Sequence, residues 1–189
     1  MPRKKRIWYP GATYHVMSRG NRRSLIYKNQ TDYTDFLNII RIISEEYPFK
    51  VHSICLMSNH YHMAVETGTT ELWRIMQKIL SIYAGEFNHR HGYNGHLFES
   101  RYTAKLIEDE QYFLEVSRYI HLNPVKAQTV REPLAYEYSR YGAFMDNRDS
   151  TNGLERRSSA VLSLKVSCWQ AVAADINGWF LQFQGCSPA

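Results

Sequence analysis

The stretch from Phe49 to Glu66 constrains the fold of this chain more than any other. Two runs rich in strand-forming residues, 49–57 and 60–66, are separated only by Ser58-Asn59. Such a short connection is typical of an antiparallel hairpin, because two residues suffice to reverse the chain. We therefore expect a β-sheet that includes this hairpin.

The second run of the hairpin alternates between apolar and polar residues. Side chains of a strand point to opposite faces in turn, so one face carries Tyr61, Met63 and Val65 and should meet the core. The other face carries His60, His62, Ala64 and Glu66. Two imidazoles at this spacing are close enough to share one metal ion, although a solvated polar face has the same pattern. Glu66 and His52 are possible additional ligands.

The remaining elements follow from periodicity and from the residues that begin or end helices. We expect strands at 13–18 and 97–107, the latter interrupted at 99–101, and helices at 32–47, 70–91 and 109–122. Thr69 or Thr70 is a candidate N-cap of the second helix, and Asn123-Pro124 should end the third. The order strand, helix, strand, strand, helix, strand, helix predicts an α+β fold with a ferredoxin-like βαββαβ core, an antiparallel sheet with its helices on one face.

Composition and the absence of certain motifs exclude several classes of function. A formal charge of +5 over 189 residues favours a polyanionic partner. Three scattered cysteines predict neither a disulfide framework nor a cysteine metal site, and no apolar run is long enough to span a membrane. No serine-hydrolase, nucleotide-binding or zinc-protease motif is present. These features predict a cytoplasmic protein with no membrane partner and no nucleotide cofactor.

The character of the chain changes after about residue 144. Residues 146–159 are polar, which is typical of a linker, and residues 160–183 are apolar again. We expect one domain over 1–145, and a linker and C-terminal tail over 146–189.

The helix expected at 109–122 carries a second group of polar residues. Tyr112 and Tyr119 are seven residues apart and share a stripe, and Tyr119 and Asn123 are one turn apart. The phenol and the amide could meet one ion. Alternatively, Tyr119 is a core aromatic residue whose hydroxyl reaches the surface.

Five segments in order resemble the REP-associated tyrosine transposases, within the single-tyrosine HUH (His-hydrophobic-His) transposases of prokaryotic insertion sequences. They are Tyr9–Val16, Ser18–Arg23, Met57–His62, Leu97–Tyr102 and Arg118–Ala127. The resemblance covers roughly residues 7–144, and the His-Tyr-His pair followed by Tyr-Ile-His-Leu-Asn-Pro-Val is its most specific part.

The resemblance implies an HUH endonuclease fold and a role for each matching residue. His60 and His62 match the metal-binding pair, Tyr119 matches the nucleophile, and Asn123 stands where relatives place a third polar ligand for Mg²⁺ or Mn²⁺. The implied substrate is a folded single-stranded DNA hairpin, cut and rejoined through a 5′-phosphotyrosine. A monomer is favoured over a dimer. Two alternatives are a replication initiator or relaxase with the same chemistry, and a catalytically silent hairpin-binding regulator.

Basic and aromatic residues are candidates for DNA contact. The candidates for phosphate binding are Arg3, Lys4, Lys5, Arg6, Arg19, Arg22, Arg23 and Arg101. Trp8 and Tyr102 could stack on unpaired bases, although a core role is the commoner one for such aromatics.

Overall fold

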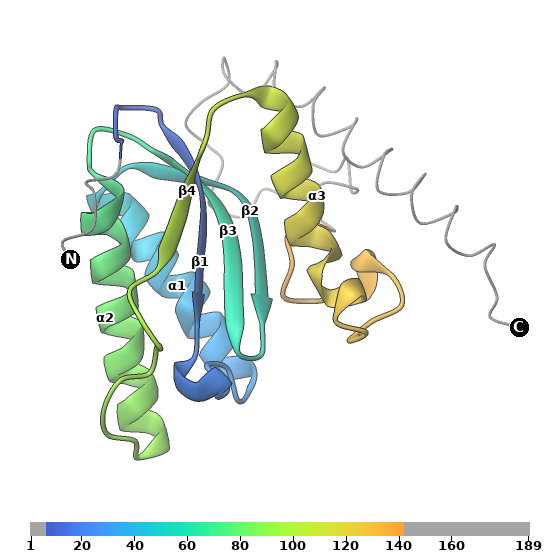
Figure 1. The fold of residues 1–189 in the computed structure, drawn as a ribbon. Helices are drawn as coiled ribbons and strands as arrows, with labels where there is room; N and C mark the ends of the chain where they lie inside the picture. The colour runs from blue at the N-terminus through green and yellow to red at the C-terminus, as the bar shows by residue number, and fades with distance from the viewer. Residues whose placement is uncertain (1–6, 142–189) are drawn as a thin grey trace, which may run out of the picture. The chain divides into compact units, whose positions relative to one another are not determined.

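A computed structural model describes residues 7–141 of the chain (Figure 1). The chain divides into two compact units, residues 1–108 and 109–189. The predicted phosphate-binding residues Arg3, Lys4, Lys5 and Arg6 lie outside the described residues, as do the linker and tail predicted over 146–189.

The first unit contains the sheet. Its elements in chain order are β1 (Thr13–Arg19), η1 (Asn21–Arg23), α1 (Gln30–Glu46), β2 (Phe49–Met57), β3 (His60–Thr67), α2 (Leu72–His91) and β4 (Thr103–Ile107). The strand order is β2-β3-β1-β4, and every neighbouring pair is antiparallel. This order confirms the ferredoxin-like α+β fold expected from the sequence.

Helices α1 and α2 pack against one face of the sheet. Figure 1 shows α1 crossing behind the strands, with α2 beside it. Phe36 of α1 lies with its ring centroid 5.1 Å from that of Tyr61 and 5.0 Å from that of Tyr83 on α2. Met63 and Val65 of the same face of β3 are 1% exposed. The apolar face predicted for this strand is therefore the core face, because its side chains fill the space beneath the two helices.

Both helices of the first unit start at sites that differ from the sequence prediction. Helix α1 begins earlier, because Asn29 and Asp32 form a capping box in which each side chain accepts the other's backbone N–H. In helix α2 the N-cap position is taken by Glu71, whose side chain makes no capping hydrogen bond, so the prediction of Thr69 or Thr70 was wrong.

The strand expected at 97–107 is shorter. Only Thr103–Ile107 pairs along β1, and Phe98 makes an isolated bridge to Gly20. The interruption at 99–101 therefore separates a single bridge from the true strand.

The second unit, within the described residues, contains α3 (Glu110–Lys126) and the short η2 (Pro133–Ala135). The prediction that Asn123-Pro124 ends the helix was wrong. Proline lacks one N–H, but in the last turn the following amides still find acceptors: Ala127 N donates to Asn123 O and Thr129 N to Pro124 O, both at 2.9 Å. The Asn123-Pro124 pair thus lies within the last turn of α3 and does not end the helix.

Across the part of the chain that the structure describes, no helix combines the length and apolar character needed to cross a membrane.

Candidate functional site

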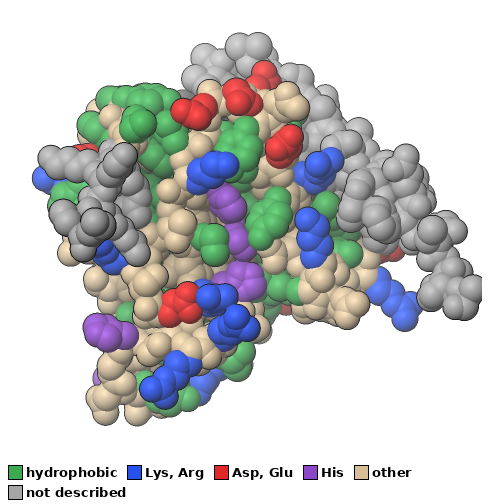
Figure 2. All heavy atoms as spheres, in the orientation of Figure 1, with side chains coloured by type: hydrophobic (Ala, Val, Ile, Leu, Met, Phe, Trp, Pro, Cys, Tyr) green, Lys and Arg blue, Asp and Glu red, His purple; other side chains and the backbone are tan. Residues whose placement is uncertain are grey.

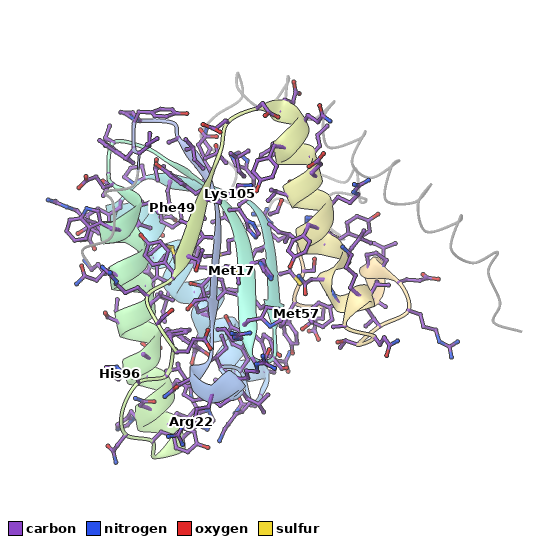
Figure 3. The ribbon with its side chains drawn as sticks, viewed as in Figure 1. Met17, Arg22, Phe49, Met57, His96 and Lys105 are labelled. Carbon is purple, nitrogen blue, oxygen red and sulfur yellow. The ribbon has the colours of Figure 1, made fainter. Side chains whose placement is uncertain are left out.

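The face of the sheet opposite α1 and α2 carries the histidine pair predicted from the sequence. On β3, His60 pairs with Arg19 of β1 and with Met57 of β2, and His62 pairs with Met17 and Cys55. Figure 3 shows Met17 in the middle of the sheet, Met57 at the end of β2 and Lys105 on β4. The two histidines therefore lie on a central strand with neighbours on both sides.

Three histidine rings are adjacent on this face. The ring centroids of His60 and His62 are 5.2 Å apart, and those of His62 and His15 are also 5.2 Å apart. Figure 2 shows histidine side chains gathered on the sheet face that is turned to the viewer. The spacing confirms that period-2 geometry brings His60 and His62 side by side.

Each of the two predicted ligands has its Nδ1 engaged by a neighbour. Nδ1 of His60 lies 2.7 Å from Oδ1 of Asn59, and Nδ1 of His62 lies 3.0 Å from Nε2 of His15. An amide oxygen only accepts, so His60 donates from Nδ1 and its neutral ring has an unprotonated Nε2. Partners of this kind orient the histidine ligands of metal ions.

Burial favours the neutral form of two histidines of this cluster, His62 and His15. The His62 side chain is buried, and burial, with smaller effects of His15 and His60, lowers its pKa to about 3. Burial and then nearby Lys105 also lower the pKa of His15. A neutral imidazole is the form that binds a metal, so the electrostatics suit a ligand role.

His15 was not among the site residues predicted from the sequence. It lies in the middle of the segment predicted as the first strand, and its alternation gave no reason to single it out. Its partner became visible only with the register, which pairs His15 with Ala64 and so places it diagonally from His62.

Two further ligands considered from the sequence do not join this cluster. His52 and Glu66 bind each other, with Nε2 of His52 2.8 Å from Oε2 of Glu66. Glu66 is four residues beyond His62 on the strand, a span of roughly 13 Å at the rise of a β-strand, too far to share its metal ion. Among the described residues, no group of three or more His, Cys, Asp or Glu side chains could hold a metal ion. Within the described residues, the first unit thus offers two imidazoles that fit a metal by type and spacing, and no third His, Cys, Asp or Glu completes a site with them.

An arginine-bearing turn borders His60. β1 ends at Arg19, and the turn that follows is fixed by three backbone bonds: Gly20 N to Asn59 O, Asn21 N to Leu97 O and Ile26 N to Ser58 O, at 2.8–2.9 Å. A Cβ on Gly20 would lie 2.1 Å from Ser24 O, so the turn requires glycine at this point. This packing holds the arginines of the turn beside the start of β3.

The arginines of this turn differ in their surroundings. Arg19 makes a two-pronged ion pair with Glu99, with contacts of 2.9 and 3.2 Å, which raises the pKa of Arg19 and lowers that of Glu99. Arg22 and Arg23 are exposed, and both have left-handed backbone conformations, with φ of 53° and 60°. Figure 3 shows Arg22 at the end of the sheet. Arg22 and Arg23 therefore present cationic side chains to solvent next to the histidines, while Arg19 is shared with a carboxylate.

The other candidates for DNA contact are divided between surface and core. Arg101 is exposed just before β4, whereas Tyr102 is 6% exposed and belongs to the core. Trp8 has intermediate exposure. A base-stacking role is thus disfavoured for Tyr102 by its burial.

Helix α3 of the second unit carries the predicted nucleophile. Tyr119 is 40% exposed, and Nζ of Lys126 lies 5.1 Å from the centre of its ring. Asn123 follows one turn later with intermediate exposure, whereas Val116 and Ile120 are buried. The alternative interpretation of the sequence, in which Tyr119 is a core aromatic residue, is therefore not supported, because its side chain is largely outside the core.

The structure brings the predicted site residues together in two groups. His60, His62 and the arginine-bearing turn lie in the first unit, and Tyr119 and Asn123 lie in the second.

Comparison with known proteins agrees with the family resemblance seen in the sequence. The sequence model described as "Transposase IS200 like" matches residues 9–123. The solved structure of a REP-associated tyrosine transposase bound to a REP hairpin is similar in fold, with a TM-score of 0.66 and 20% identity, over 78% of this chain and 87% of that one. A putative transposase from Deinococcus radiodurans aligns with a TM-score of 0.44 and 13% identity over 63% and 95% of the two chains, too weakly to support an argument. No curated protein matches the chain.

Proposed function

This chain belongs to the IS200-like transposase family, and on that basis we propose that it is a metal-dependent endonuclease and strand transferase acting on single-stranded DNA. Cleavage and rejoining take place at folded palindromic hairpins through a 5′-phosphotyrosine intermediate. Tyr119 is the nucleophile, and His60, His62 and Asn123 hold Mg²⁺ or Mn²⁺. The family match includes all four positions.

The adjacent rings of His60 and His62 carry this proposal. Their centroids are 5.2 Å apart on one face of a central strand, and the ring of His62 is held neutral by burial. Amide and imidazole donors are compatible with Mg²⁺ or Mn²⁺, and Mn²⁺ accepts nitrogen ligands more readily. A bound ion of this kind would withdraw charge from a non-bridging phosphate oxygen and so reduce the repulsion that protects a phosphodiester from attack.

Tyr119 performs the covalent step. Its oxygen bonds to phosphorus while the bond between phosphorus and the 3′ oxygen breaks; the phenol releases its proton and the 3′ oxygen gains one. One phosphate ester replaces another, so a second 3′-hydroxyl can reverse the step without a nucleotide cofactor. The exposure of Tyr119 supports this role, because a nucleophile must be reached by DNA.

The basic residues contact the DNA backbone. Arg22, Arg23 and Arg101 are exposed in the first unit, and Arg22 and Arg23 belong to a turn fixed beside His60. Arg19 contributes once Glu99 is displaced, and the basic segment Arg3, Lys4, Lys5 and Arg6 adds charge. A hairpin substrate is supported by the fold shared with the REP-associated transposase whose structure contains a REP hairpin.

The test is covalent capture of labelled hairpin DNA. The full chain is mixed with single-stranded hairpins and Mg²⁺ or Mn²⁺, and protein–DNA adducts are counted after denaturation. We expect Tyr119→Phe to lose the adduct and keep hairpin binding, because only the hydroxyl is removed. Tyr112→Phe, seven residues earlier on α3, is the matched control and should keep the adduct. An undiminished adduct in Tyr119→Phe would refute the assignment.

The metal role is tested by the same capture. We expect EDTA, or the double change His60→Ala with His62→Ala, to abolish cleavage. His52→Ala, which removes a histidine of the same sheet that is bound to Glu66, should not. Cleavage that persists in EDTA would rule out the metal. Binding without any adduct in the wild type would identify a silent hairpin-binding regulator, and nicking of circular plasmids in place of hairpins would identify an initiator or relaxase.

A further inference from the structure

His15 is the neighbour of His62 that no sequence pattern identified. Its Nε2 lies 3.0 Å from Nδ1 of His62, and the two rings are tilted by 31° with centroids 5.2 Å apart. The strand register fixes this approach, because His15 pairs with Ala64 and Met17 pairs with His62. The contact therefore joins two central strands of the sheet at the candidate metal site.

The direction of this hydrogen bond determines what His62 can do. If His15 donates, the neutral ring of His62 has its proton on Nε2, and neither nitrogen has a lone pair left for a metal. If His62 donates from Nδ1, its Nε2 is unprotonated and able to bind a cation. His60 already shows the second arrangement, because its Nδ1 faces Oδ1 of Asn59 at 2.7 Å.

We propose that His15 is a positioning residue that accepts a hydrogen bond from Nδ1 of His62 and so holds His62 in the tautomer whose Nε2 can bind a metal ion. This inference rests on the proposed function of His60 and His62. His15 and Asn59 then have the same task, each fixing one of the two ligands from outside the metal's own shell.

The tautomer can be measured without any metal. In the full chain labelled with ¹⁵N-histidine, long-range ¹⁵N–¹H spectra separate the two neutral tautomers, and His62→Gln assigns the signals of His62 by their loss. We expect the metal-free wild type to have the His62 proton on Nδ1. A proton on Nε2 of His62 would overturn the proposal, whatever the activity of the protein.

Affinity for Mn²⁺ supplies the second readout. Glutamine at position 15 can place an amide oxygen near the position of Nε2, whereas phenylalanine fills the space and accepts nothing. We expect His15→Phe to weaken Mn²⁺ binding by about 10- to 100-fold and His15→Gln to restore most of it, as found for residues that orient metal ligands. His52→Gln, on the same sheet, is the control and should bind as the wild type does.

The outcomes separate this inference from the proposed function. Equal affinity of the wild type and His15→Phe, or an equal loss in both His15 variants, would overturn the positioning role. A wild type that binds no Mn²⁺ would overturn the proposed metal site instead, and the His62 tautomer would then decide the hydrogen-bond assignment by itself.

Discussion

At the scale of single residues, the two consecutive arginines of the first turn are unusual. Arg22 and Arg23 both have positive φ, a conformation that costs a residue with a Cβ about 1–2 kcal/mol. Glycine would adopt it without that cost. Arginine at these two positions therefore lowers the stability of the fold and places two exposed cations beside His60. Strained residues of this kind are found mostly at functional sites.

Arg22→Gly should therefore separate stability from binding. We expect the free energy of unfolding to rise by about 0.5 kcal/mol, because the gain from relieved strain exceeds the entropy that glycine adds to the unfolded chain. Hairpin affinity should fall, and the slope of log K against log salt should decrease by about one, as for one lost phosphate contact.

Urea unfolding and salt-dependent binding would check both parts. Arg41→Gln is the charge control, because Arg41 is an exposed arginine of α1, paired with Glu45, away from the turn. Loss of stability in Arg22→Gly, or an equal change of salt slope in both variants, would contradict the prediction.

At the scale of elements, Asp32 joins the start of α1 to the end of α2. Its buried carboxylate accepts from the backbone N–H of Lys28 at 2.8 Å, from Arg90 at 2.7 Å and from His91 at 3.0 Å. Burial alone would raise its pKa, but the hydrogen bonds from Lys28, His91 and Arg90 outweigh it and hold the pKa below the usual value. One side chain thus ties the start of α1 to two side chains in the last turn of α2.

Asp32→Asn should loosen this junction. We expect a loss of about 2–3 kcal/mol in the free energy of unfolding, because the buried side chain loses its charge and some of its acceptor bonds together. Asp35→Asn, which removes only the outer partner of Arg90, should cost less than about 1 kcal/mol. Chemical unfolding of both variants tests this; equal losses would show that the buried carboxylate has no special role.

At the scale of the whole molecule, we expect a buried histidine to make the free energy of unfolding depend on pH. His121 of α3 has Nδ1 2.9 Å from Oγ of Ser139 and packs against Tyr141. Burial, with a smaller effect of Arg140, lowers its pKa to about 3. The unfolded chain binds the proton more readily, so the stability from this group is complete above pH 6.5 and is lost as the pH falls toward 3.

His121→Asn should make unfolding less dependent on pH. Between pH 7 and pH 5 we expect the wild type to lose about 2 kcal/mol more than the variant, because 1.5 pH units below the unfolded value correspond to about that free energy. Urea unfolding at both pH values measures the difference. His89→Gln, at an exposed position of α2, should leave it unchanged; a wild type and His121→Asn with the same pH dependence would contradict the prediction.

Much of the fold could be predicted because its signals are local. Alternation identified the hairpin and both faces of β3, and helical spacing identified the three long helices. The ends were harder, because local rules compete: the capping box at Asn29 moved the start of α1, and Pro124 was tolerated in the last turn of α3. Boundaries depend on such small differences in free energy.

The candidate site could be predicted only where its residues belong to a single element. His60 and His62 share a face by strand geometry alone, so the sequence predicted their proximity. The contact of His15 with His62, 47 residues apart, and that of Arg19 with Glu99, 80 residues apart, depend on strand pairing and loop packing. No spacing within one element could reveal them.

The place of β1 in the sheet has a consequence for how the site is made. β1 is synthesised first, yet both strands that flank it, β3 and β4, are made later. On the ribosome the β2–β3 ribbon can close by a local turn, whereas β1 must dock on it across a long loop, and the other edge of β1 is paired only after β4 has been made. The contact between His15 of β1 and His62 of β3 forms only when these two strands have paired. The ¹⁵N signals of the two rings would therefore report when the sheet of a newly synthesised chain has assembled.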